Sequence, residues 1–288
     1  MHRAGSFQIV AGAILFGLIP VFVSSCAGLS ITSIALGRAL FAALFAGSVL
    51  LLKGGNLRIR RKELLHYFTW TLFLTGAILC YVLSIRYTGV AVSGALLGIQ
   101  PVFIILFVRL FFAEKIRTQA MLSCIVAMAG IILVSGIGGS ENYSAKGCVF
   151  GLLSAVFLGL NFTYHLKFMK HESPLRLVYI QNLLQLPVLL PFVLVNPGTV
   201  SFVGIGSVFF MGIFCTSIAY LLIYSGSKKV NKQYIGILQL VENIIPVFIG
   251  ALVYRESISI AAGWGIALIL LSALMAGGRQ EKRVSVSN

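Results

Sequence analysis

Long apolar runs, each about the length that crosses a lipid bilayer as a helix, recur along almost the whole chain. A helix needs roughly 20 consecutive apolar residues to span the hydrocarbon core of a bilayer. Short linkers containing Gly, Asn and Ser separate the runs, and such residues favour turns between helices. We predict ten membrane-spanning helices, at about residues 6–25, 31–52, 65–86, 90–112, 117–137, 147–166, 175–195, 202–224, 233–254 and 260–278.

The composition agrees with this pattern and narrows the class of protein. Hydrophobic residues make up 59% of the chain, charged residues only 10%, and the mean hydropathy is +1.00. A soluble domain carries roughly 25% charged residues. The sequence therefore predicts an all-α integral membrane protein. Its five cysteines lie in or beside apolar runs without metal-ligand or disulfide spacing, so we interpret them as core residues.

The formal net charge of +15 comes from Lys and Arg residues that lie between the apolar runs. Nucleic-acid binding would instead need a basic soluble face with groups that read or stack on bases, so we exclude that partner. If the N-terminus is cytoplasmic, nearly all of these charges fall on the cytoplasmic side. Only Arg86, Lys146 and Arg255 fall outside, and Arg38 lies within a run. The positive-inside rule then places both termini in the cytoplasm, and the charges face anionic lipid headgroups.

The chain also repeats itself at a constant shift of 142 residues. The pairs that match without gaps include Gly5 with Gly147, Gly17 with Gly159, Gly94 with Gly236, Gln100 with Glu242 and Glu114 with Glu256. We predict two five-helix units, residues 1–140 and 141–288, within one membrane domain. Because five is odd, the second unit crosses the membrane in the opposite sense, which is the inverted-topology repeat of many transporters.

Several motifs of this repeat resemble the EamA-like family of the drug/metabolite transporter superfamily. They are Tyr87-Thr88-Gly89-Val90-Ala91, Gln100-Pro101-Val102-Phe103, Glu114-Lys115-Ile116, Val241-Glu242-Asn243, Val253-Tyr254-Arg255-Glu256-Ser257-Ile258, and Arg38 in the second run. The resemblance covers nearly the whole chain and implies ten helices, cytoplasmic termini and export of small metabolites, amino acids or drugs. The chain departs from the family pattern at Gln100, where glutamate is frequent, and at Asn243, where proline is frequent.

Glu242 is the strongest candidate for the chemistry of the protein. It lies about nine residues into its run, or roughly 13 Å by the helical rise, close to the bilayer midplane. A carboxylate at that depth is costly and marks a functional site by default. The repeat predicts that Gln100 faces it across the pseudo-twofold axis. Glu242 is expected to bind a cationic group or carry a proton; pairing with Arg38, or hydrogen bonding to Asn243, is the structural alternative.

The other candidate groups are spread over several runs. Arg38 could meet a substrate carboxylate, pair with Glu242 or extend to the headgroups. Asn161, Tyr81 and Tyr220 are predicted to line the cavity. Tyr164 and Tyr224 suit interfacial anchors, and Gln181, Asn182 and Gln185 suit hydrogen bonds between helices. Glu114 and Glu256 are predicted to position the helices that follow them.

Together these features predict a secondary transporter, and specifically an exporter, of an amino acid, an amine or a drug-like solute. One central site at the midplane would open alternately to each side. An exchanger of phosphorylated or nucleotide sugars is the alternative within the class. An integral-membrane enzyme is the alternative outside it, but the four histidines form no metal-binding pair and no nucleophile motif accompanies them. We expect no cofactor, a cytoplasmic-membrane location, and a monomer or homodimer, and coupling to protons stays open.

Overall fold

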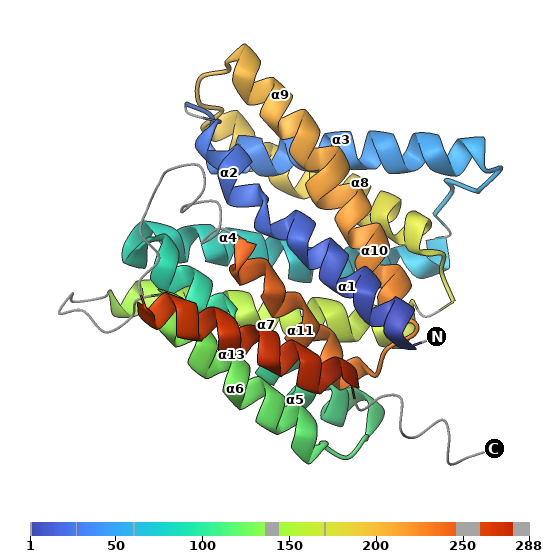
Figure 1. The fold of residues 1–288 in the computed structure, drawn as a ribbon. Helices are drawn as coiled ribbons and strands as arrows, with labels where there is room; N and C mark the ends of the chain where they lie inside the picture. The colour runs from blue at the N-terminus through green and yellow to red at the C-terminus, as the bar shows by residue number, and fades with distance from the viewer. Residues whose placement is uncertain are drawn as a thin grey trace.

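The structure is a computed structural model that describes residues 2–26, 28–59, 61–135, 144–169, 171–245 and 260–278. Within these ranges the chain is helical apart from short loops and one isolated antiparallel bridge, between Leu29 and Gly198. The first half of the chain forms α1 (His2–Gly17), α2 (Ile19–Ser24), α3 (Ile31–Leu52), α4 (Arg61–Leu97), α5 (Gln100–Phe112) and α6 (Thr118–Ser135) (Figure 1).

The second half continues the helical pattern but contains irregular turns. It forms α7 (Ala145–Phe168), α8 (Pro174–Val195), α9 (Phe202–Phe210), the π-helix η1 (Met211–Ile218), α10 (Ala219–Ser227), the 3₁₀-helix η2 (Lys232–Tyr234), α11 (Ile235–Gln239), the 3₁₀-helix η3 (Leu240–Asn243) and α13 (Ile260–Gly278). Glu256 and Pro246 lie outside the described residues, as does the end of the ninth predicted run.

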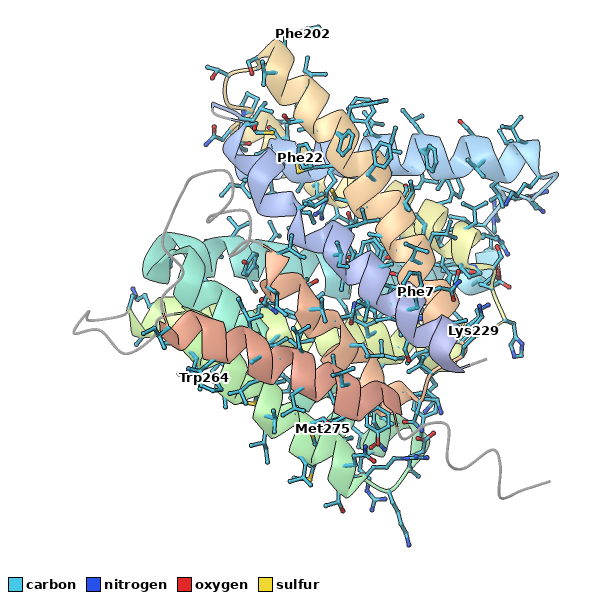
Figure 2. All side chains as sticks on the ribbon, in the orientation of Figure 1. Phe7, Phe22, Phe202, Lys229, Trp264 and Met275 are labelled. Atoms are coloured by element: carbon cyan, nitrogen blue, oxygen red, sulfur yellow. The ribbon has the colours of Figure 1, made fainter. Side chains whose placement is uncertain are left out.

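The protein is a multi-pass membrane protein. Within the described residues, five helical stretches are long and apolar enough to cross a bilayer: Ile31–Leu52, Glu63–Ser84, Ala145–Phe168, Pro174–Val195 and Phe202–Ser227. Shorter apolar helices cover 4–17, 100–112, 118–133 and 263–275. Large apolar side chains point outward from the helices, among them Phe7, Phe202 and Trp264 (Figure 2). Such a surface suits contact with lipid, and the number of ten spans stays a prediction.

The predicted boundary between the third and fourth runs is wrong. α4 continues without interruption to Leu97, and the chain instead breaks at Gly98 and Ile99. Helical sequence persists through residues 86–90 because one glycine, Gly89, costs a helix only about 1 kcal/mol. The break follows from Pro101, which lies in the first turn of α5. Proline has no backbone N–H, and in the first turn of a helix that N–H would have no partner within the helix, so a new helix can begin there.

Helices from the two halves of the chain pack against each other throughout. α1 packs on α10, α4 on α7, α3 on α8, and α6 on α13. At the 142-residue shift, the contact of α1 with α10 corresponds to the contact of α7 with α4. The contacts of α3 with α8 and of α6 with α13 correspond to themselves with the two halves exchanged. Ser154 donates to the Ala77 carbonyl across α7 and α4, and a methyl group on Gly12 would come within 2.8 Å of the Ala219 carbonyl across α1 and α10.

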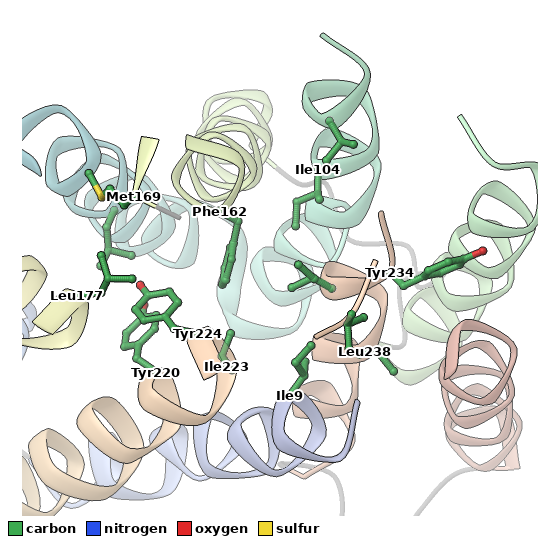
Figure 3. Close-up of a cluster of buried hydrophobic side chains, with 14 of the residues drawn as sticks. Ile9, Ile104, Phe162, Met169, Leu177, Tyr220, Ile223, Tyr224, Tyr234 and Leu238 are labelled. Atoms are coloured by element: carbon green, nitrogen blue, oxygen red, sulfur yellow. The ribbon is translucent and has the colours of Figure 1, made fainter. Parts of the chain in front are cut away.

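The largest buried cluster joins both halves at the centre of the molecule. It includes Ile9 of α1, Ile104 of α5, Phe162 of α7, Ile223 of α10 and Leu238 of α11 (Figure 3). Burying a side chain of this size stabilises a protein by roughly 1.5–3 kcal/mol in water. In a membrane the lipid is as apolar as the side chains, so close packing between helices stabilises the cluster instead. The cluster therefore holds α11, and the 3₁₀ turn after it, against the first half of the chain.

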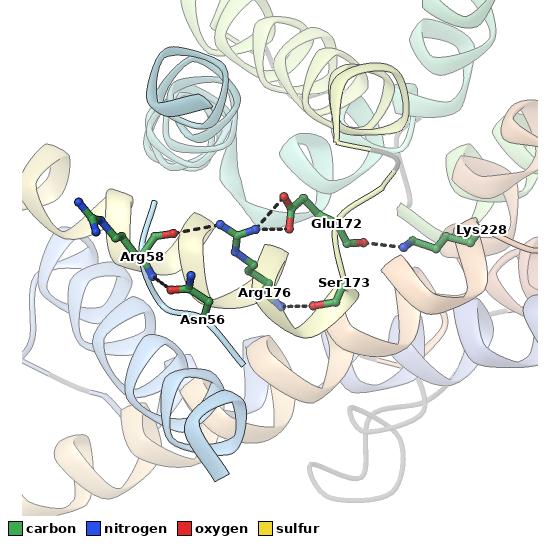
Figure 4. Close-up of polar contacts among 6 residues, drawn as sticks. All are labelled: Asn56, Arg58, Glu172, Ser173, Arg176 and Lys228. Atoms are coloured by element: carbon green, nitrogen blue, oxygen red, sulfur yellow. Dashed lines mark hydrogen bonds and ion pairs between the residues drawn. The ribbon is translucent and has the colours of Figure 1, made fainter. Parts of the chain in front are cut away.

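A polar network closes the end of the bundle where α8 begins (Figure 4). Arg176 Nη1 lies 2.8 Å from both carboxylate oxygens of Glu172, and Nη2 donates to the Arg58 carbonyl at 3.1 Å. Lys228 donates to the Glu172 carbonyl. The network ties the loop before α8 to the loop before α4 and to the end of α10. By the charge pattern this is the predicted cytoplasmic side.

Candidate functional site

Both halves of the chain interrupt a helix at the same place in the repeat. In the first half α4 ends at Leu97, and a turn at Gly98 and Ile99 precedes Gln100. In the second half α11 ends at Gln239 and tightens into η3, which contains Glu242. The tight hydrogen bonds correspond as well: Val102 N–H donates to the Ile99 carbonyl, and Ile244 N–H, 142 residues later, donates to that of Val241.

The two interrupted helices lie in contact. A methyl group on Gly236 of α11 would come within 2.8 Å of Ile104 and 3.1 Å of the Pro101 backbone, both in α5. The missing side chain at Gly236 thus allows a close crossing one residue from Gln100. On the other side of η3, Gly17 ends α1 against the Glu242 carbonyl, which a methyl group would approach to 2.7 Å.

Glu242 is partly exposed within this crossing and lies within electrostatic range of two tyrosines, Tyr81 of α4 and Tyr220 of α10. Tyr220 is buried and meets Phe16 edge-on, with ring centroids 4.9 Å apart. The structure thus places Glu242 within electrostatic range of two tyrosines that the sequence predicts to line the cavity. Aromatic faces near a carboxylate suit a cationic group.

Arg38 approaches the same tyrosine from α3. Tyr220 and Cys215 lie within electrostatic range of its guanidinium, and its Nε is buried without a hydrogen-bond partner. Ion pairs among the described residues join Arg176 to Glu172 and Lys232 to Glu114, and neither Arg38 nor Glu242 takes part in one. The predicted alternative of an Arg38–Glu242 pair is thus not formed. Tyr220 thus lies within electrostatic range of both Arg38 and Glu242.

Gln100 and Asn243, which follow the two interruptions, differ in their contacts. Gln100 is buried at 7% exposure, and its Nε2 has no hydrogen-bond partner. Asn243 donates from Nδ2 to the Leu240 carbonyl at 3.1 Å and so closes its own 3₁₀ turn. The contact of Asn243 stabilises the interruption itself, whereas the Nε2 of Gln100 makes no hydrogen bond within the described part of the chain. The binding roles of both stay predictions.

Asn161 is held by a neighbouring helix. Its Nδ2 donates to the Trp70 carbonyl at 2.9 Å, and Trp70 Nε1 donates back to the Asn161 carbonyl at 3.0 Å. Both residues are fully buried. These reciprocal bonds join α7 to α4 and give Asn161 a structural contact. Its predicted role in binding is untested.

The interpretation of Tyr224 as an interfacial anchor is wrong. Tyr224 is fully buried, donates its hydroxyl hydrogen to Gln181 Oε1, and stacks on Tyr220 at 5.4 Å between ring centroids. His165, also buried, lies 4.8 Å from it on the same measure. The i, i+4 spacing of the two tyrosines is a sequence signal for this column, but only the packing of α1 and α8 over the end of α10 decides that it is buried.

The part of the chain that the structure describes contains no cluster of three His, Cys, Asp or Glu side chains able to hold a metal ion. The isolated polar groups around Glu242 differ from one another in type and come from five helical segments. This set presents no paired nucleophile and base among the residues named above.

These observations describe a multi-pass helical bundle whose two halves interrupt equivalent helices at Gln100 and Glu242. The model of the EamA-like transporter family matches residues 3–136 and again 145–278. The chain belongs to this family. Each match begins and ends 142 residues from the other, which is the shift read from the sequence.

Relatives share this length and organisation. An uncharacterized transporter of Archaeoglobus fulgidus is 27% identical over 279 residues, covering 95% of this chain and 96% of the relative. The uncharacterized transporter YxxF of Bacillus subtilis is 24% identical over 288 residues, covering 97% and 91%. A solved structure, titled only as the crystal structure of a protein, superposes with a TM-score of 0.84 at 17% identity, over 94% of this chain and 97% of that one. That likeness shows the fold alone.

Proposed function

We propose that the protein is a secondary transporter that exports a small organic metabolite, an amino acid, an amine or a drug-like solute, across the cytoplasmic membrane. One observation carries the proposal: Gln100 and Glu242 occupy equivalent interruptions of the two halves, and Glu242 has no ion-pair partner among the described residues. Interrupted helices free backbone groups and aim side chains at a ligand near the bilayer midplane.

The mechanism follows from the repeat. Residues 1–140 and 141–288 form two five-helix units of inverted topology, giving ten spans with both termini in the cytoplasm. The exchanged contacts between the halves, such as Ser154 with Ala77 and Gly12 with Ala219, support a pseudo-twofold relation. Because related units can exchange conformations at similar free energy, the central site opens first to one side and then to the other.

The residues around Glu242 assign roles within the site. The carboxylate of Glu242 binds the cationic group of the solute, and Tyr81 and Tyr220 contribute their aromatic faces. Gln100 and Asn243 face the solute from the two interruptions. Among the described residues, Arg38 supplies positive charge within electrostatic range of Tyr220. Phosphorylated sugars would need more positive charge than one guanidinium, so their exchange is the weaker candidate.

Counterflow into proteoliposomes tests the proposal. Vesicles containing the purified protein are loaded with an unlabelled solute, and uptake of the same labelled solute is followed over a panel of amino acids, amines and sugars. Export by alternating access predicts faster labelled uptake into loaded vesicles for one chemical class. Equal uptake by loaded, unloaded and protein-free vesicles for every solute would overturn the proposal.

A further inference from the structure

A buried glutamine of η2 ties the second half of the chain to the loop that follows α5 in the first half. Gln233 is 1% exposed. Its Oε1 accepts a hydrogen bond from the Arg117 N–H at 3.0 Å, and its Nε2 donates to the Lys115 carbonyl at 3.0 Å. One side chain of the second half thus satisfies a backbone donor and a backbone acceptor of the first half.

Lys232, the preceding residue, contacts the same loop. Its ammonium group pairs with Glu114 and lies 4.1 Å from the centroid of the Phe112 ring at the end of α5. Both charged side chains are about one-third exposed, so solvent screens the pair and it contributes little by itself. The two buried hydrogen bonds of Gln233 are therefore the stronger part of the latch, as we call the contacts of Lys232 and Gln233 with residues 112–117.

The backbone on each side of the latch is held in a defined turn. Asn231 precedes η2, and its Oδ1 accepts a hydrogen bond from the Gln233 N–H at 3.1 Å. Ala113 ends α5 in the left-handed region, at a φ of 52°, which residues with a Cβ atom rarely adopt. Such a conformation persists where the surrounding contacts hold it. The turn at Ala113 leads directly into the backbone groups that Gln233 binds.

The latch joins the ends of the two interrupted helices that lie away from the central site. α5 runs from Gln100 to Phe112, and η2 and α11 lead from Lys232 toward the turn that contains Glu242. α5 packs against both η2 and α11. By the charge pattern, the latched ends are on the predicted cytoplasmic side. A solute that enters from the cytoplasm between these helices therefore needs the latch to open.

The repeat does not supply the same latch on the other side of the membrane. At the 142-residue shift, Lys232 and Gln233 correspond to Val90 and Ala91. The side chains of Val and Ala carry neither a charge nor a hydrogen-bonding group. Two units of inverted topology would otherwise give the two conformations of the transporter similar free energies. The latch thus favours the conformation that is closed to the cytoplasm.

We propose that the latch makes the conformation closed to the cytoplasm the resting state, and that its opening is the step that admits a solute from the cytoplasm. This inference rests on the proposed function. When the latch opens, water replaces Gln233 as the partner of the Arg117 N–H and the Lys115 carbonyl, so the contacts break and re-form in each cycle. A solute binds from the cytoplasm to the open fraction alone, and the closed fraction lowers its apparent affinity from that side.

Gln233→Leu tests the latch through a gain in affinity. Loss of two buried hydrogen bonds is expected to shift the equilibrium toward the open conformation by about tenfold. Inverted membrane vesicles present the cytoplasmic side to the medium, and uptake into them is measured for whichever labelled solute of the counterflow panel is transported. The KM in Gln233→Leu is expected to fall by about tenfold, because more of the protein is open to the solute.

Asn182→Leu is the matched control for this gain. It also removes a buried amide, but the hydrogen bond of Asn182, to the Val178 carbonyl at 2.8 Å, stays within α8. Its KM is expected to equal that of the wild type. An unchanged or higher KM in Gln233→Leu would overturn the proposal, since a variant with a merely structural defect does not bind its solute more tightly.

A reversible cross-link tests whether the latch must open. Glu114→Cys and Lys232→Cys are combined, and the two cysteines are joined by a short bis-methanethiosulfonate reagent that a reductant removes. Counterflow is expected to stop on cross-linking and to return on reduction. The wild type, with its five free cysteines, receives the same reagent and is expected to stay active. Counterflow that survives complete cross-linking would overturn the latch and leave the transporter standing, whereas no counterflow by the wild type would overturn the proposed function itself.

Discussion

Gly17 lies directly against Ile245, so closely that a methyl group on Gly17 would come within 2.5 Å of the Ile245 side chain. At the 142-residue shift, Gly159 is the equivalent of Gly17 and Phe103 is the equivalent of Ile245. This pair makes the same contact, since a methyl group on Gly159 would come within 2.8 Å of Phe103. In each pair a glycine from one half meets the interrupted helix of the other half. The packing around the two interruptions therefore follows the same 142-residue repeat as the interruptions themselves.

The first prediction concerns this close approach. Gly17→Ala is expected to destabilise the protein by about 1–3 kcal/mol, the usual effect of overpacking, because the new methyl group meets both Ile245 and the Glu242 carbonyl. Thermal melting of the purified protein measures it. The control is Gly206→Ala in α9, where no atom lies within 4 Å of the added methyl group. Equal melting temperatures for the two variants would refute the contact.

The second prediction concerns the buried tyrosine column. Tyr224→Phe leaves Gln181 Oε1 without its donor in a buried environment, so the free energy of unfolding is expected to fall by about 1–3 kcal/mol. Tyr164→Phe is the control, because its hydroxyl bonds to His66 Nδ1 at an exposed position. An equal loss in the free energy of unfolding for both variants would contradict the claim that burial makes the Tyr224 hydrogen bond costly to lose.

The third prediction separates structure from binding at Asn161. Asn161→Ala breaks the bond to the Trp70 carbonyl and is expected to cost about 1–3 kcal/mol of stability while leaving the KM for the solute unchanged. Melting and transport are measured on the same preparation. If instead KM rises and the melting temperature holds, Asn161 binds the solute, as the sequence suggests.

The helical class of the fold and the choice of Glu242 as a candidate both follow from the sequence, because they depend on patterns that a membrane makes strict. Long apolar runs must form helices in lipid, and one carboxylate inside such a run stands out. The 142-residue shift then pairs Glu242 with Gln100, and the structure places both at interruptions. Proline at position 101 was the local signal for the first of them.

Other features depend on tertiary packing and carry no local signal. The continuation of α4 through Gly89 shows that a single glycine does not fix a helix end. The burial of Tyr224 depends on which helices cover α10, and its hydrogen bond to Gln181 depends on the contact between α8 and α10. Two amides four residues apart have the same pattern whether they join helices or face a solute, so their partners could not be predicted.

The most direct test of the central site is counterflow by Glu242→Gln beside Glu114→Gln. The first change removes the unpaired carboxylate at the interruption but keeps the size of the side chain. The second removes a carboxylate that pairs with Lys232 and is about one-third exposed. We predict that Glu242→Gln abolishes counterflow with its melting temperature near that of the wild type, while Glu114→Gln retains most activity. Undiminished counterflow by Glu242→Gln would contradict the account, because the solute would then cross without the group on which the site is built.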